Sequence, residues 1–313
     1  MNGGVVIVAY PDDEHGSALE QYLISRDERV LRTSLPAVAS TGITWDHSGA
    51  VTLGGLPLGP GGWSGFWRRP GRADLRHIEP RFGSFAETEL RDSFNGSLLS
   101  AGVRWINDPI TLGRAENKLV QLSVARSLGI DVPETLVTSS ETRAERFLAD
   151  GDEAVVKAVR YGLVSSGSTP EFAWTHVMYP DAERRYHGIP VLIQRRIRAL
   201  HHVRIVTVGR RTFVYCLENA SPEHVDWRQV EANHSRWRPA NRAPKNVRIG
   251  AVRLARALRL SFTSQDWIVD ESSHPVFLEA NPNGQWMFLE GKDEPITAAI
   301  GEWLIRSRKA PHP

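Results

Sequence analysis

The pattern of apolar and polar residues along the chain switches repeatedly between a strand-like period of about two residues and a helix-like period of about 3.6 residues. Helical spacing is found at residues 15–26, 85–101, 114–128, 141–149 and 247–258. Strand-like runs occupy residues 3–10, 103–107, 154–160, 191–197, 201–208 and 212–217, and hairpins are predicted over residues 43–54 and 266–281. This interleaving of the two patterns predicts an α/β (α+β) fold.

The helix predicted at residues 114–128 has the clearest apolar stripe. We expect its inner face to consist of Leu119, Leu122, Ala125 and Leu128. Gly129 follows directly and supplies the left-handed conformation with which many helices end.

Length and composition narrow the class of protein. A chain of 313 residues is long enough for two or three domains, and we place the boundaries to give domains 1–108, 109–190 and 191–313. Hydrophobic residues make up 41% and charged residues 24%, which excludes a disordered chain and a coiled-coil rod. The net charge of +2 gives no electrostatic reason to expect a nucleic-acid partner. Because no apolar run is long enough for a signal peptide or a membrane span, we expect a cytoplasmic protein without a membrane partner.

The hairpin at residues 266–281 carries the most informative chemistry. If its turn spans residues 271–274, Asp270 faces Pro275, and Asp266 falls opposite Glu279. Asn281 lies two residues after Glu279 and therefore points to the same side of the sheet. Two carboxylates and an amide oxygen at one place suit a hard cation such as Mg²⁺. The alternative is a pair of exposed strand carboxylates followed by an ordinary turn.

Three basic residues are candidates for binding an anion such as a nucleotide phosphate. Lys157 lies among apolar residues of a predicted strand, and the small, hydroxyl-rich segment 161–169 that follows has the composition of a mobile flap. Lys118 lies near the start of a helix and Arg204 lies within a strand. Each could equally be an ordinary surface residue. The chain lacks both the G-x-G-x-x-G fingerprint and the P-loop pattern, which excludes the common dinucleotide and P-loop sites.

Taken together and in order, these residues resemble those of the ATP-grasp ligases. The resemblance rests on the segments WINDPITLGRAENKLVQLSVARSLGIDVPETLVT, AVVKAV, VLIQRRI, VRIVTVG, SQDWIVD and VFLEANPNGQW, and it covers nearly all of the chain from Phe66 onward. Within that family, FWRRP, WIN-x-P and LE-x-NPNGQW look most similar to the ATP-grasp maturases of ribosomal peptides, the microviridin-type or graspetide macrocyclases.

The resemblance implies an ATP-grasp fold, in which an N-terminal pre-ATP-grasp α/β domain precedes two α+β subdomains that hold the nucleotide between them. ATP and two Mg²⁺ ions are the implied cofactors. The implied phosphate contacts are Lys118, Lys157 and Arg204, of which Lys157 and Arg204 are catalytic, the implied adenine hinge is Gln194, Arg195, Arg196 and Ile197, and the implied metal ligands are Asp266, Glu279 and Asn281. The sequence departs from the family at the hinge, where QRRI stands in place of a segment with a carboxylate, and at His202, where an acidic residue is common.

The function implied is the macrocyclisation of a ribosomally made precursor peptide with a leader and an acidic core. The enzyme would activate Asp or Glu side chains as acyl phosphates, which Ser or Thr hydroxyls or a Lys amine then attack to give ω-esters or ω-amides. Two alternatives remain open, namely an intermolecular ligase that adds an amino acid or peptide to a carboxylate and an inactive nucleotide-binding scaffold. The resemblance also implies a homodimer.

Overall fold

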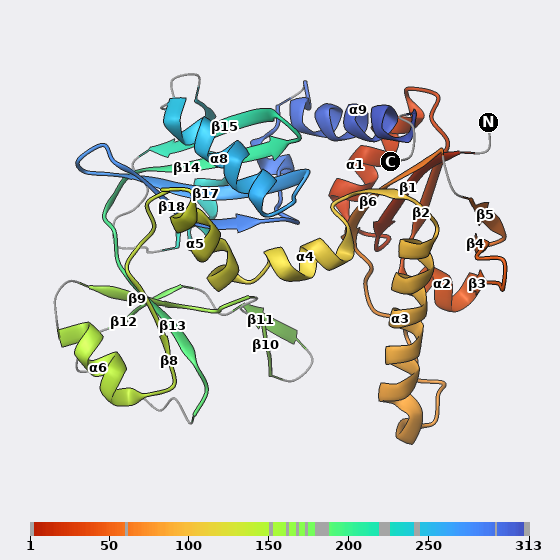
Figure 1. The fold of residues 1–313 in the computed structure, drawn as a ribbon, viewed down its shortest axis with the longest axis horizontal. Helices are drawn as coiled ribbons and strands as arrows, with labels where there is room; N and C mark the ends of the chain where they lie inside the picture. The colour runs from red at the N-terminus through yellow and green to blue at the C-terminus, as the bar shows by residue number, and fades with distance from the viewer. Residues whose placement is uncertain are drawn as a thin grey trace. The chain divides into compact units, whose positions relative to one another are not determined.

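The computed structural model describes residues 3–309 except residues 60–61, 150–152, 161–162, 167–168, 173–174, 179–187, 219–225, 241–244 and 292 (Figure 1). The chain forms two compact units. The first consists of Met1–Leu112, Leu260–Phe262 and Gln285–Pro313, and the second of Gly113–Arg259 and Thr263–Gly284. The division into domains 1–108, 109–190 and 191–313 stays a prediction.

The first unit is built on a parallel sheet with the strand order β2-β1-β6-β7. Its strands are β1 (Gly4–Ala9), β2 (Val30–Thr33), β6 (Trp63–Arg69) and β7 (Arg104–Ile106). Strand β1 has the sequence GVVIVA and is buried throughout, as expected of a central parallel strand covered on both faces. The helices α1 (Glu14–Ile24) and α9 (Pro295–Lys309) pack against each other, and Gly301 leaves room for the ring of Tyr22 that no larger residue would leave.

Further elements of the first unit lie outside this sheet. They are α2 (Leu35–Thr41), the antiparallel strands β3 (Ile43–Trp45), β4 (Val51–Leu53) and β5 (Leu56–Leu58), η1 (Pro80–Phe82), α3 (Gly83–Ser100) and η3 (Met287–Leu289). The hairpin predicted at residues 43–54 is confirmed. Helix α3 packs through its C-terminal half, which contains the buried Phe94 and Leu98, and its N-terminal half projects away from the sheet (Figure 1).

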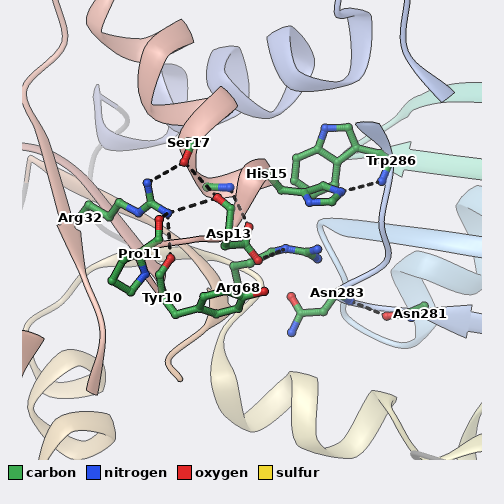
Figure 2. A network of polar contacts seen from close by, with 11 residues as sticks. Tyr10, Pro11, Asp13, His15, Ser17, Arg32, Arg68, Asn281, Asn283 and Trp286 are labelled. Atoms are coloured by element: carbon green, nitrogen blue, oxygen red, sulfur yellow. Dashed lines mark hydrogen bonds and ion pairs between the residues drawn. The ribbon is translucent and has the colours of Figure 1, made fainter. Parts of the chain in front are cut away.

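A buried polar network lies where β1 and β6 end (Figure 2). Asp13 caps α1 by accepting a hydrogen bond of 2.8 Å from the amide of Gly16, and its other carboxylate oxygen lies 3.5 Å from Nε of Arg68. Burial lowers the pKa of Arg68 to about 10 despite the attraction of Asp13. The guanidinium of Arg68 lies over the ring of Trp286 at 5.3 Å, and the Trp286 amide donates to Nε2 of His15 at 3.2 Å. These contacts attach the C-terminal segment of the chain to α1.

The second unit contains an antiparallel sheet of order β12-β9-β13-β8. Its strands are β8 (Thr135–Thr138), β9 (Ala154–Lys157), β12 (His176–Met178) and β13 (Val191–Arg195). Helix α6 (Glu141–Ala149) buries Ala144 and Leu148 against Ala154 and Ile193. A separate two-stranded ribbon consists of β10 (Leu163–Ser166) and β11 (Thr169–Phe172).

The other sheet of the second unit has the order β16-β15-β14-β17-β18. Its strands are β14 (Ala199–Val208), β15 (Arg211–Glu218), β16 (Arg238–Pro239), β17 (Phe262–Asp270) and β18 (Pro275–Asn281). Helix α8 (Lys245–Ala257) packs on β14 and β15, and α5 (Lys118–Ser127) packs on β18 (Figure 1). The short elements η2 (Trp227–Gln229) and α7 (Glu231–His234) lie between β15 and β16 in the sequence.

The single helix predicted over residues 114–128 is wrong. The chain forms α4 (Pro109–Ala115) and α5 instead, because Asn117 leaves the helical conformation and its side chain caps α5 by accepting from the amide of Leu119 at 2.9 Å. Leu119 is 41% exposed and does not belong to the inner face, whereas the polar Gln121 does. Gly129 has the predicted left-handed conformation, with φ of 69°.

Within the described ranges, no helix is long and apolar enough to cross a lipid bilayer.

Candidate active site

The hairpin of β17 and β18 places Asp266 directly opposite Glu279, as predicted. One detail of the predicted register is wrong by one residue: Pro275 pairs with Val269 and not with Asp270. The register shifts between Asp266 and Trp267, where Leu278 is the extra residue of a β-bulge on β18. The bulge restores the register, so that the two carboxylates still share one face of the sheet.

Helix α5 fixes β18 and brings a lysine to Glu279. The buried side chain of Gln121 donates to the carbonyl oxygen of Ala280 at 2.7 Å and accepts from its amide at 2.9 Å. One helical turn earlier, Nζ of Lys118 lies 3.2 Å from a carboxylate oxygen of Glu279. A side-chain amide thus takes the place of a neighbouring strand along the outer edge of β18, and the same helix presents the lysine.

Lys118 also connects this sheet to the strand that carries Lys157. Its amide donates to the carbonyl oxygen of Val159 at 3.0 Å, and its Nζ donates to the carbonyl oxygen of Arg160 at 3.1 Å. Lys157 is the last residue of β9, just before this segment. The two lysines predicted to bind phosphate are therefore brought together at the N-terminus of α5, an end of a helix that itself favours anions.

Arg204 reaches Asp266 from β14, the strand next to β17. Its Nε donates to Oγ of Ser264 at 2.7 Å and lies 3.3 Å from Oδ1 of Asp266. That separation allows ionic attraction, but among the described residues no hydrogen bond to this buried oxygen is found. A buried carboxylate oxygen without a donor is costly in an apolar interior and is a suitable ligand for a cation.

The ionisation of these groups follows from their burial and their mutual charges. Burial alone would raise the pKa of Glu279, but the positive charges of Lys118, Arg228 and Lys157 lower it to about 2. Burial raises the pKa of Asp266 and outweighs the opposite effect of Arg204. Burial also lowers the pKa of Lys157, although the charge of Glu279 opposes this shift. Charges of both signs are thus held close together with little water.

Two further observations bear on whether the predicted metal ligands suit Mg²⁺. Oδ1 of Asn281 accepts a hydrogen bond of 2.9 Å from the amide of Asn283, which shapes the turn after β18 (Figure 2). Gly284 completes this turn and packs so closely on Ser264 that a Cβ atom would not fit. No group of three or more His, Cys, Asp or Glu side chains is gathered as for a metal ion in the described part of the chain. The predicted set of two carboxylates and one amide supplies only oxygen ligands, which fits Mg²⁺ and not zinc.

The predicted hinge residues form a different environment. Gln194 is buried and donates from Nε2 to Oγ1 of Thr135 at 3.0 Å. The ion pairs are Arg195 with Glu134 at 3.3 Å and Arg196 with Glu153 at 2.7 Å. A hollow of about 440 Å³ is lined by Glu153, Arg195, Arg196, Ile197, Arg198, Asp270, Glu271 and Ser272. These are other residues than those around Asp266 and Glu279, and the contact of Gln194–Ile197 with adenine stays a prediction.

The predicted flap contains the ribbon of β10 and β11, in which Leu163 pairs with Phe172 and Ser166 with Thr169. Residues 161–162 and 167–168 of the predicted segment lie outside the described residues. The covering of phosphates by this flap stays a prediction.

No sequence pattern pointed to Asp226 and Arg228, which lie at the start of the short 3-10 helix η2. The two side chains form a double hydrogen bond, from Nε to Oδ1 at 2.7 Å and from Nη2 to Oδ2 at 2.6 Å. Asp226 and Lys157 also act on His202, whose pKa burial lowers to about 4. The histidine that replaces the common acidic residue is therefore neutral near pH 7. Segments without periodicity give no prediction of where their side chains point.

Comparisons with known proteins identify the fold. No protein-family profile and no curated protein matches the sequence. Among solved structures, the chain is similar to a Chryseobacterium gregarium RiPP-associated ATP-grasp ligase in complex with ADP and a leader and core peptide. The TM-score is 0.86 at 20% identity, over 100% of this chain and 98% of that one. RiPP denotes a ribosomally synthesised and post-translationally modified peptide.

Two other solved structures show the same architecture. The macrocyclase MdnC from Microcystis aeruginosa, bound with its precursor peptide MdnA, gives a TM-score of 0.80 at 20% identity over 96% of this chain and 99% of that one. The ATP-grasp ligase PsnB, complexed with a minimal precursor, Mg and ADP, gives 0.78 at 21% identity over 98% of both chains. The predicted ATP-grasp fold is confirmed. At these identities the likeness concerns the fold, and the function has to be argued from the site.

Proposed function

We propose that this protein is an ATP- and Mg²⁺-dependent ligase that macrocyclises a ribosomally made precursor peptide. One observation supports the chemistry above all others, namely the register that sets Asp266 opposite Glu279, with Arg204 and Lys118 each within 3.3 Å of one of the two carboxylates. Carboxylates that face each other can bind metal ions, and fixed cations beside them can bind the phosphates of a nucleotide triphosphate. The likeness to solved macrocyclases, which reaches from end to end of the chain, supports the choice of a peptide substrate.

In this proposal the residues around the hairpin bind and orient the nucleotide. Lys118 and Lys157 hold its phosphates, and Arg204 contacts the terminal phosphate. The metal ligands are Asp266, Glu279 and Asn281, and bound Mg²⁺ supplies positive charge that offsets the negative charge of the phosphates. Gln194, Arg195, Arg196 and Ile197 lie beside the adenine.

The reaction then needs no nucleophile from the enzyme. An Asp or Glu carboxylate of the peptide attacks the terminal phosphorus of ATP, ADP leaves, and an acyl phosphate forms on the peptide. A Ser or Thr hydroxyl or a Lys amine of the same peptide attacks the acyl carbon, loses its proton and expels phosphate. Lys157 and Arg204 stabilise the charge that develops on the transferring group. Such stabilisation typically lowers the activation free energy by roughly several kcal/mol.

The partner in this proposal is a precursor peptide with a leader and an acidic core. Solved proteins of the same fold are bound to a leader and core peptide or to a precursor, which supports the choice of a peptide partner. A homodimer and a cytoplasmic location belong to the proposal as well.

The test uses the short acidic reading frame expected beside the gene, which would encode the peptide. The purified protein is incubated with this peptide, ATP and Mg²⁺, and the products are weighed by mass spectrometry. Macrocyclisation removes the mass of one water molecule per bond and releases ADP in proportion. A mass gain equal to an added amino acid would show an intermolecular ligase instead. The absence of peptide-dependent ADP release would indicate an inactive scaffold and would overturn the proposal.

A further inference from the structure

The backbone of Lys118 is fixed by its neighbours, whereas its side chain is long and flexible. Asn117 caps α5 just before it, and the Lys118 amide donates to the carbonyl oxygen of Val159 at 3.0 Å. A lysine side chain has a flexible four-carbon stem that ends in an ammonium group with three donors. The ammonium of Lys118 can therefore change partners without any movement of α5 or of the segment after β9.

The ammonium of Lys118 contacts one of the predicted metal ligands. Nζ lies 3.2 Å from a carboxylate oxygen of Glu279 and donates to the carbonyl oxygen of Arg160 at 3.1 Å. The side chains of Lys118 and Glu279 are 15% and 23% exposed, so salt and water screen their attraction less than on the surface. Burial would raise the pKa of Glu279, but the nearby positive charges, among which that of Lys118 has the largest effect, lower it to about 2. Glu279 is therefore charged, and one of its oxygens already has a cation as a partner.

The charges around the hairpin disfavour a metal ion that comes alone. The predicted phosphate contacts Lys118, Lys157 and Arg204 carry three positive charges, whereas the predicted ligands Asp266 and Glu279 carry at most two negative charges. The neighbouring ion pair after β15 adds no net charge. Burial and the charge of Lys118 both act to lower the pKa of Lys157, which shows that the two lysines repel each other. Such an arrangement attracts an anion before it attracts a divalent cation.

We propose that Lys118 sets the order in which the site is filled: it holds Glu279 until a triphosphate takes over its ammonium, and only then is Glu279 free to bind a metal ion. This inference rests on the proposed function, because it assumes that the nucleotide phosphates bind at Lys118. The ammonium has three donors and the contacts with Glu279 and Arg160 use two, so a phosphate oxygen can be bound before Glu279 is released. The metal ion therefore enters together with the nucleotide and not before it.

The experiment measures the binding of Mn²⁺ without nucleotide. Mn²⁺ takes the same oxygen ligands as Mg²⁺, and its free concentration is followed by electron paramagnetic resonance. Lys118→Met removes the ammonium and keeps the length of the side chain. We expect this variant to bind Mn²⁺ at least about 10-fold more tightly than the wild type, since the ion no longer has to displace a cation from Glu279. It should bind AMPPNP without metal at least about 10-fold more weakly, because one charged contact with phosphate is lost.

Two further substitutions each remove one positive charge and serve as comparisons. Arg126 is exposed on the same helix, and Arg126→Met should leave both affinities unchanged. Lys157 has a smaller effect on Glu279 than Lys118, so Lys157→Met should gain no more than about threefold in affinity for Mn²⁺. Equal gains in Lys118→Met and Lys157→Met would show that only the total charge of the site matters, and would overturn the inference. An unchanged affinity for Mn²⁺ in Lys118→Met would overturn it as well.

Failure of the inference and failure of the proposed function give different results. A wild type that binds AMPPNP while Lys118→Met gains no affinity for Mn²⁺ refutes the order of binding and leaves the proposed function intact. A wild type that binds AMPPNP neither with nor without Mg²⁺ refutes both. If thermal unfolding shows that Lys118→Met does not fold, Lys118→Gln decides, because its amide can still donate to the carbonyl oxygen of Arg160 while the charge is gone.

Discussion

Glu279→Gln is the most direct perturbation of the candidate active site, because it removes one charge and keeps the shape of the side chain. The glutamine can still accept a hydrogen bond from Lys118, whose Nζ lies 3.2 Å from the carboxylate in the wild type. What disappears is the negative charge that the predicted metal ion needs opposite Asp266.

The effect on folding is a balance of opposing contributions. At 3.2 Å and an effective dielectric constant of about 20, the attraction between Glu279 and Lys118 is about 5 kcal/mol. The substitution loses this attraction, but it also removes the cost of burying the charge and the repulsion from Asp266. Because these contributions are of similar size in buried pairs, we expect the free energy of unfolding to change by no more than about 2 kcal/mol.

The effect on catalysis should be much larger. A metal ligand without charge weakens both the binding of the ion and the stabilisation of the transferring phosphate. We expect kcat/KM for peptide-dependent ADP release to fall by at least about 1,000-fold, or about 4 kcal/mol of transition-state stabilisation.

The assay couples ADP release to a spectrophotometric signal over a range of Mg²⁺ concentrations, and thermal unfolding of each variant is followed in parallel. The control is Glu145→Gln, an exposed position on α6 with the same change in charge. We expect the control to behave as the wild type. A Glu279→Gln enzyme with near wild-type kcat/KM at saturating Mg²⁺ would refute the assignment of the metal site. Loss of activity together with unfolding would refute the expectation that the lost attraction to Lys118 is offset by the relieved cost of burying the charge.

Three further predictions concern other buried polar groups. Lys157→Met should abolish ATP turnover and raise the melting temperature, because burial lowers the pKa of the lysine and so makes its charge costly to the folded state; a lower melting temperature would contradict this. Burial lowers the pKa of His15 to about 3, so its contribution to stability is complete above pH 6.5 and is lost as pH falls, by about 1.4 kcal/mol per unit between pH 6.5 and 3. Denaturant unfolding at pH 7 and pH 5 should show this loss in the wild type and not in His15→Gln, whose amide oxygen can still accept from the Trp286 amide. Gln121→Leu leaves two backbone groups of β18 without partners, so we expect about 2 to 4 kcal/mol of destabilisation and a lower kcat/KM; an unchanged denaturation midpoint would contradict the role of Gln121.

The predicted elements agree best with the structure where the local pattern is long and regular. The sequence GVVIVA leaves little choice but a buried strand, and β1 covers it. The break at Asn117 was not predicted, because a capping side chain interrupts the helix without interrupting the apolar spacing around it.

For the site residues too, what could be predicted depends on how close together the residues lie in the sequence. The pairing of Asp266 with Glu279 could be predicted, since it depends on a short hairpin within one segment of the chain. The contact between Lys118 and Glu279 could not be predicted from a local pattern, because the two residues lie far apart in the sequence. Asp226 and Arg228 were not predicted, because the three-residue helix η2 is too short to show a period from which the direction of its side chains follows.

Residues close together in the chain are enough to predict most local elements and the face that the two hairpin carboxylates share, whereas the resemblance to ATP-grasp ligases depends on the order of motifs spread over nearly all of the chain from Phe66 onward. Three contacts could be seen only in the folded chain: Gln121 holds β18, Arg204 lies beside Asp266, and the C-terminal segment with Trp286 packs on His15 and Arg68 in the first unit. No local pattern predicts them, because the free energy of a buried polar group depends on the partners that the fold brings to it from distant parts of the chain.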